Sequence, residues 1–109
     1  MKVLAIPKVL KYIESLVPVL YEQGYFSFED SARKYVKDLY DDIQTNLPTK
    51  QHKPASKYFD KYGKNMEYAV FKKNKNTSWY VFFKKYRENK ETIYLIRYIG
   101  NNHTVAQYL

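Results

Sequence analysis

Residues 67–99, EYAVFKKNKNTSWYVFFKKYRENKETIYLIRYI, decide the fold. They contain three runs rich in β-branched and aromatic residues, the types that favour β-strands. The polar segments NKNT and ENKE separate the runs, and their lengths are typical of hairpin connections. We therefore predict strands at 67–72, 78–84 and 92–99 that pair in sequence as an antiparallel meander.

Two amphipathic helices are predicted before the meander, because apolar residues recur there at helical spacing. The first stripe consists of Val9, Ile13, Leu16, Val17 and Leu20. The second and more regular stripe consists of Ala32, Val36, Leu39, Ile43 and Leu47. With a short turn between them, the two helices should form an antiparallel hairpin.

Local signals refine these two helices. Pro18 lacks a backbone N–H, so it should kink the first helix or divide it in two near Val17. Gly24 is expected to cap the end of that helix in a left-handed conformation. Ser27 with Asp30 resembles a capping box that would open the second helix.

The remaining segments complete the expected fold. An apolar run at 2–6, ended by Pro7, predicts another strand, whereas the polar residues 49–57 predict a loop. The chain is thus expected to form a single α+β domain, residues 1–109. Its N-terminal strand and three-stranded antiparallel meander would form a four-stranded sheet, with the two-helix hairpin on one face.

The last strand is apolar on both of its alternating sets of residues. One set is Tyr94, Ile96 and Tyr98, and the other is Ile93, Leu95, Arg97 and Ile99. One face must pack on the helices, so the second face is either partly covered or an amphipathic binding surface that carries Arg97. A strand buried on both faces in the middle of the sheet would give the same pattern.

Several classes of function lack their signature residues. The chain has no cysteine, no Gly-rich phosphate loop and no metal-ligand spacing around its two histidines, His52 and His103. We therefore expect neither a metal nor a small-molecule cofactor. No apolar run could span a bilayer, and charge appears too early for a signal peptide. No membrane partner is expected, and a cytoplasmic location is the default.

The net charge of +8 lies entirely in the second half of the chain. Residues 1–48 carry six Lys or Arg and seven Asp or Glu, whereas residues 49–109 carry thirteen and four. Such a concentration suggests a polyanionic partner: RNA, DNA or an acidic peptide. The alternative is a solvated basic surface that only aids solubility.

Basic residues cluster beside the predicted hairpin turns and are interleaved with aromatic ones. The candidate RNA-binding residues are Lys72, Lys73 and Lys75 at the first turn and Lys84, Lys85 and Arg87 near the second. Cations neutralise phosphates and aromatic faces stack on unpaired bases, so the combination suits single-stranded or looped RNA. Strand aromatics also form cores, and Trp79 is assigned to the core.

The end of the chain supplies three candidate catalytic residues. His103 follows the last strand, where a histidine can act as general acid or base, or can be an ordinary surface or capping residue. Arg97 could stabilise the charge of a phosphorane, and Tyr108 could donate a hydrogen bond or transfer a proton. Metal-free RNA cleavage needs only such groups, because the 2′-hydroxyl is the internal nucleophile.

The order of elements resembles the RelE/ParE superfamily of type II toxins. The resemblance rests on MKVLAIPKVLKYIESL (1–16), the strand SWYVFF (78–83) and the last strand with its tail, IRYIGNNHTVAQY (96–108). It implies a ribosome-dependent messenger-RNA endonuclease or a DNA gyrase inhibitor. By position, Tyr108 matches a tail tyrosine of the nucleases, His103 lies near their late histidine and Arg97 matches a last-strand arginine. Ala69 and Phe71 stand where the resemblance leads us to expect lysines.

Three functional hypotheses follow, in this order. The first is a toxin-like, metal-free endoribonuclease that acts on ribosome-bound messenger RNA and has an acidic antitoxin protein as its partner. The second is a non-enzymatic module on the same scaffold, either a gyrase-directed toxin or a nucleic-acid or protein adaptor. The third is a degenerate toxin-fold protein that only binds a partner.

Overall fold

A five-stranded sheet lies at the centre of the protein, and the computed structural model describes all of residues 1–109. The strands are β1 (Lys2–Ala5), β2 (Lys53–Pro54), β3 (Glu67–Lys72), β4 (Ser78–Glu88) and β5 (Glu91–Asn101). The α-helices are α1 (Pro7–Glu22), α2 (Glu29–Asn46) and α3 (Asn102–Val105). The short 3-10 helices are η1 (Leu47–Thr49), η2 (Lys57–Lys61) and η3 (Ala106–Tyr108). The expected α+β class is confirmed.

The strand order is β1-β5-β4-β3-β2, and the sheet is mixed. The predicted meander of β3, β4 and β5 is antiparallel, whereas β1 lies at one edge and runs parallel to β5. The prediction of four strands is corrected, because β2 lies within the expected loop and pairs with the start of β3. A strand of two residues is too short to leave a periodic signal in the sequence.

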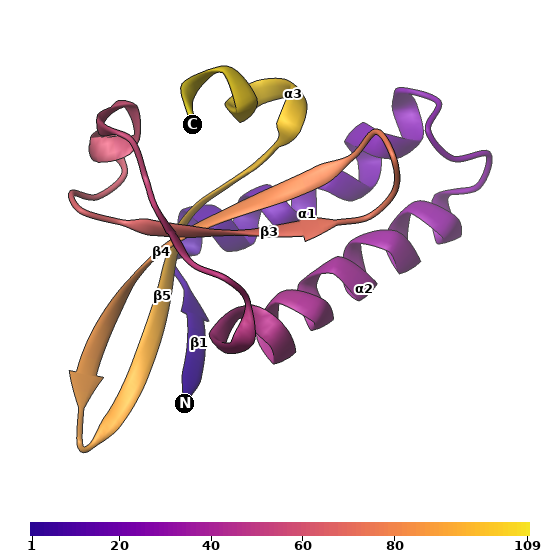
Figure 1. Cartoon of the computed structure of the whole chain (residues 1–109). Helices are drawn as coiled ribbons and strands as arrows, with labels where there is room; N and C mark the ends of the chain where they lie inside the picture. The colour runs from indigo at the N-terminus through magenta and orange to yellow at the C-terminus, as the bar shows by residue number, and fades with distance from the viewer.

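The hairpin of β4 and β5 is longer than predicted. It continues to a two-residue turn at Asn89 and Lys90, whose φ angles are 49° and 63°, as in a type I′ turn. The hairpin projects away from the helices (Figure 1), so its outer residues are exposed. Those residues are mostly charged, so the apolar pattern of the sequence predicts a strand that ends at Lys84.

Both predicted apolar stripes form the main core. α1 buries Val9, Ile13 and Leu16, and all five residues of the second stripe are buried. Except for Ala32, these side chains pack on one face of the sheet, against a set of strand residues that alternate along β3 and β4. That set is Ala69, Phe71, Trp79, Val81 and Phe83. The assignment of Trp79 to the core is confirmed.

The helix ends show which local signals were reliable. Pro18 does not divide α1, which continues through it to its last turn. Gly24 has a φ of +77° and caps that helix as predicted. The capping box at Ser27 is wrong: α2 has Phe28 at its N-cap, with no side-chain hydrogen bond there. Asp30 is the expected partner of Ser27, but its Oδ1 lies 3.8 Å from Arg33 Nη1 instead.

A β-bulge at Arg97 changes which residues of β5 share a face. Phe82 is in register with Tyr98 and Phe83 with Ile96, so Arg97 has no partner on β4. Ile96 and Ile99 therefore both face the helices, although they belong to opposite alternating sets. The bulge explains why both sets of the last strand are apolar.

The second face of the sheet is partly covered, one of the alternatives left open by the sequence. Figure 1 shows η2 and the C-terminal tail on the opposite side of the strands from α2. Beneath them lies a smaller core of Phe59, Met66, Tyr68, Phe82 and Val105. The cover does not extend to the β4–β5 hairpin or to the neighbouring β1, where Tyr86 and Leu4, respectively, are exposed.

Candidate nucleic-acid interface

Four tyrosines and one lysine lie together on the second face of the sheet. We call this set the tyrosine–lysine cluster: Tyr58, Lys61, Tyr62, Tyr98 and Tyr108. Three segments distant in sequence supply its members: η2 with the residue after it, β5 and the C-terminal tail. Phe59 anchors η2, because its side chain is fully buried and stacks on Phe82 with ring centroids 4.2 Å apart.

Tyr58 lies in the middle of a short column of side chains. Its ring is parallel to that of Tyr108, with centroids 3.6 Å apart, and Lys61 Nζ lies 3.9 Å from its centroid. Hydrogen bonding with Tyr58 raises the pKa of both Lys61 and Tyr108. At neutral pH the column therefore carries a charged ammonium and a neutral phenol. The Ser56 hydroxyl donates to the Tyr108 carbonyl oxygen at 2.5 Å and holds the tail beside η2.

Tyr62 and Tyr98 form a second stacked pair in the cluster. Their ring centroids are 4.1 Å apart and their planes differ by 10°. Burial, together with the neighbouring Tyr62, raises the pKa of Tyr98 to about 12. Tyr98 is consequently a neutral phenol under physiological conditions and does not serve as a base.

The segment KYFDKYGK, residues 57–64, combines this aromatic surface with positive charge. Lys57, Lys61 and Lys64 are exposed, and Tyr58 keeps 41% of its surface accessible. Aromatic rings stack on unpaired bases and the lysines can neutralise phosphates. The prediction from sequence missed this segment because it has no strand periodicity. Its interleaving of lysine and aromatic residues is the signal that could have identified it.

Arg97 is already engaged within the fold. Its Nε–H donates to the Tyr62 carbonyl oxygen at 2.6 Å. Gly63 lies so close that an added Cβ would be 2.9 Å from the same nitrogen. Arg97 also lines a small cleft of about 140 Å³ with Lys8 and Tyr12. The geometry gives it a positioning role toward the loop that carries the tyrosine–lysine cluster.

The three predicted catalytic residues occupy separate surroundings. His103 is exposed in the first turn of α3, and it lines a different, larger cleft of about 480 Å³. Its backbone N–H donates to Asn101 Oδ1 at 2.9 Å. Tyr108 belongs to the tyrosine–lysine cluster and lines neither cleft, whereas Arg97 lines the smaller one. The three side chains do not converge on a common pocket.

The six predicted RNA-binding residues are divided between the two ends of the sheet. Lys72, Lys73 and Lys75 lie at the β3–β4 turn, and Lys84, Lys85 and Arg87 lie on the part of β4 that leads to the opposite turn (Figure 1). Lys85 pairs with Glu67 at 3.2 Å, and Arg87 donates to Thr92 Oγ1 at 3.0 Å. The six residues therefore form two basic patches with the tyrosine–lysine cluster as a third positive region.

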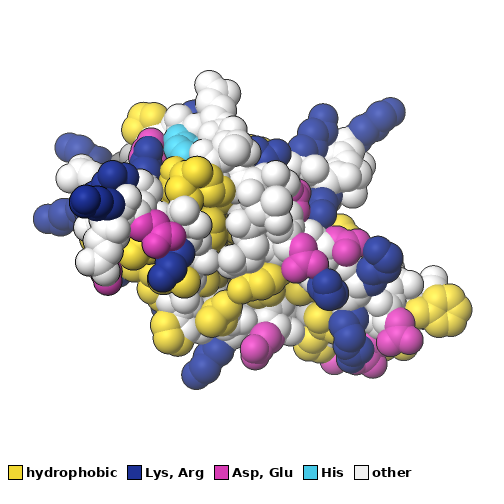
Figure 2. Space-filling model, turned by 90° about the horizontal axis from the view of Figure 1, so that it is seen from below, with side chains coloured by type: hydrophobic (Ala, Val, Ile, Leu, Met, Phe, Trp, Pro, Cys, Tyr) yellow, Lys and Arg dark blue, Asp and Glu magenta, His cyan; other side chains and the backbone are white.

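On helix α2, acidic side chains neutralise the basic ones, whereas the second half of the chain has an excess of basic residues. Acidic and basic side chains are intermixed over the right-hand end of Figure 2, where α2 lies. There Lys34 pairs with Asp38 at 2.8 Å and Lys37 with Asp41 at 2.7 Å. The excess positive charge thus belongs to the sheet, its turns and the η2 segment.

No protein-family model, curated protein or solved structure matches the chain. Neither α1 nor α2 combines the length and the apolar composition that a membrane crossing requires.

Proposed function

We propose that the protein is an RNA-binding toxin of the RelE/ParE type that arrests translation by engaging messenger RNA on the ribosome. The observation that carries the proposal is the tyrosine–lysine cluster, where stacked tyrosines adjoin exposed lysines. An unpaired base can extend such a stack, and the lysines attract its phosphates. Double-stranded RNA offers no free base faces, so single-stranded RNA suits this surface better.

The element order also supports this assignment. The resemblance to the RelE/ParE superfamily was based on an opening strand, a helix pair, a meander and a tail, and the structure has these elements in the same order. The basic turns at both ends of the sheet suit a large polyanion such as ribosomal RNA. In this proposal an acidic antitoxin neutralises the same basic surfaces when the toxin is inactive.

Binding is better supported than cleavage. Cleavage would require Arg97, His103 and Tyr108 to act on one phosphate, yet they lie in different surroundings and Arg97 already donates to the Tyr62 carbonyl oxygen. A non-enzymatic inhibitor on the same scaffold is therefore the second candidate. In both versions the tyrosine–lysine cluster holds the RNA.

Induced expression in a bacterial host tests the proposal. We expect wild-type protein to stop incorporation of labelled amino acid, and Tyr58→Ala and Lys61→Ala to relieve the arrest. Primer extension on messenger RNA then separates the two versions, because only the nuclease creates new 5′ ends. Continued protein synthesis at full rate in cells that accumulate folded wild-type protein would refute the proposal. A DNA-damage response without translation arrest would instead indicate a gyrase-directed toxin.

A further inference from the structure

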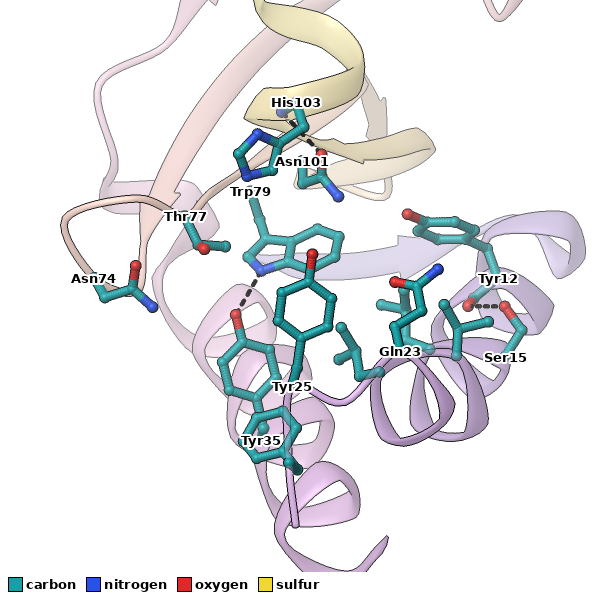
Figure 3. A pocket seen from close by; sticks show the side chains of 14 residues that line it. Tyr12, Ser15, Gln23, Tyr25, Tyr35, Asn74, Thr77, Trp79, Asn101 and His103 are labelled. Carbon is teal, nitrogen blue, oxygen red and sulfur yellow. Dashed lines mark hydrogen bonds between the residues drawn. The ribbon is translucent and has the colours of Figure 1, made fainter. Parts of the chain in front are cut away.

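The larger cleft lies between helix α1 and three neighbouring segments (Figure 3). Its walls are α1, the turn from α1 to α2, the β3–β4 turn and the start of α3. Its volume of about 480 Å³ falls within the range of sites for small ligands. The buried indole of Trp79 forms part of the lining, and its Nε1–H donates to the Tyr35 hydroxyl at 2.9 Å.

The lining of the cleft is aromatic and amide-rich, and His103 is the one side chain that can carry positive charge. The rings belong to Tyr12, Tyr25, Phe26, Tyr35 and Trp79, and the amides belong to Gln23, Asn74 and Asn101. No Lys, Arg, Asp or Glu lines the cleft. Such a surface suits a flat, neutral ring with hydrogen-bonding groups on its edge. A nucleobase has these properties.

Two polar groups have donors free for such a ligand. Asn101 Oδ1 accepts the backbone N–H groups of His103 and Thr104, so its amide NH₂ remains available. The Tyr35 hydroxyl accepts the Trp79 indole N–H and keeps its own proton to donate. In Figure 3 the amides of Asn101 and Gln23 both point toward the hollow. Donors held in this way suit the carbonyl and ring-nitrogen acceptors on a base edge.

The β3–β4 turn supplies positive charge beside the cleft rather than within it. Lys73 Nζ lies 5.7 Å from the Tyr35 ring centroid, and its neighbour Asn74 is part of the wall. Lys75, two residues along, is exposed. A base inside the cleft could thus leave its phosphate outside, near these lysines.

We propose that this cleft binds one unpaired nucleobase of an RNA strand, with the adjoining phosphate on Lys73 and Lys75. The proposal rests on the RNA-binding function proposed above and adds to it a specific site. It also gives the first basic turn a role separate from the tyrosine–lysine cluster.

Trp79 is the only tryptophan in the chain, so its fluorescence reports on the cleft directly. We would titrate the full-length protein with AMP, GMP, CMP and UMP, and use ribose 5-phosphate as a probe that lacks a base. We expect saturable quenching by at least one nucleotide and none by ribose 5-phosphate. Tyr25→Ala should weaken that affinity by about tenfold, since the ring is lost while the exposed site tolerates the change.

Two further variants keep the outcome interpretable. Gln23→Leu removes an amide from the exposed wall and should also weaken nucleotide binding, whereas Tyr21→Ala, outside the cleft, should not. Equal quenching by ribose 5-phosphate, or no quenching by any nucleotide, would overturn the base site. If oligoribonucleotides still bind through Tyr58, the proposed function survives that failure. If no oligoribonucleotide binds but a mononucleotide does, the proposed RNA-binding function is refuted, and the cleft is a site for a free nucleotide only.

Discussion

Arg97 Nε donates a hydrogen bond to the backbone carbonyl oxygen of Tyr62 at 2.6 Å, so the bulge of β5 holds the end of η2 against the sheet. From the sequence, Arg97 was a candidate for stabilising a phosphorane. A guanidinium that already donates through Nε keeps only its Nη groups for a ligand. The contact therefore links the stability of the fold to the order of the tyrosine–lysine cluster.

Replacing Arg97 should destabilise the protein even without RNA. We expect Arg97→Ala to lower the free energy of unfolding by about 1.5–3 kcal/mol, the usual range for a hydrogen bond to a charged group. Urea denaturation measures the change. Arg33→Ala is the matched control, because Arg33 makes an exposed pair with Glu29 whose loss should cost less than about 1 kcal/mol. Equal stability of the two variants would contradict the positioning role.

Gly100 allows the tail to dock on the sheet. A Cβ at this position would lie 2.7 Å from Val105 Cγ1, which is closer than carbon atoms approach. We expect Gly100→Ala to cost about 1–3 kcal/mol by overpacking and to loosen residues 102–109. Hydrogen exchange of the tail amides should become faster, whereas Ala106→Ser, an exposed change in the same tail, should have little effect. Unchanged exchange in Gly100→Ala would show that the tail is held differently.

Tyr98 should make stability depend on alkaline pH. Its pKa is raised by burial from 10.0 to about 12, so the folded protein keeps a proton that the unfolded chain releases. The contribution of Tyr98 to the free energy of unfolding is therefore fully present below about pH 10 and is lost as the pH rises toward 12. Urea unfolding across that window should show a steeper decline in wild type than in Tyr98→Phe. Identical slopes would mean that Tyr98 titrates normally.

The β4–β5 turn contains a residue in an unfavourable conformation. Lys90 has a φ of 63°, a left-handed value that a side chain with a Cβ disfavours. We expect Lys90→Gly to raise the free energy of unfolding by about 0.5–1 kcal/mol, because glycine suits this position of a type I′ turn. Lys90→Ala removes the same charge but keeps the Cβ, so it should give no comparable gain. A similar response from both variants would assign the effect to charge.

The parts of the fold with strong periodic signals were predictable from sequence. The apolar stripes of α1 and α2 and the bounds of β3 follow from side-chain spacing, which burial imposes directly. β2 was not predictable, since two residues carry no period. The bulge at Arg97 was also hidden, because it moves later residues of β5 to the other face without changing composition.

The candidate site was only partly predictable, because it depends on contacts between segments that are distant in the sequence. The basic turns were visible in sequence, but their separation to opposite ends of the sheet depends on the hairpin geometry. The stack of Tyr58 on Tyr108 joins η2 to the tail, and nothing in either segment alone indicates the other. The engagement of Arg97 by the Tyr62 carbonyl oxygen is likewise a tertiary contact that no local pattern encodes.

The central claim is that the tyrosine–lysine cluster binds unpaired RNA, and fluorescence anisotropy of a short labelled oligoribonucleotide tests it most directly. The informative pair is Tyr58→Ala and Tyr21→Ala, because these tyrosines are 41% and 42% exposed and only Tyr58 belongs to the cluster. We expect Tyr58→Ala to weaken binding by about fivefold or more, because Tyr108 and Lys61 lose the ring that holds them in one column, and Tyr21→Ala to bind like wild type. Equal affinity of the two variants for the oligoribonucleotide would contradict the claim.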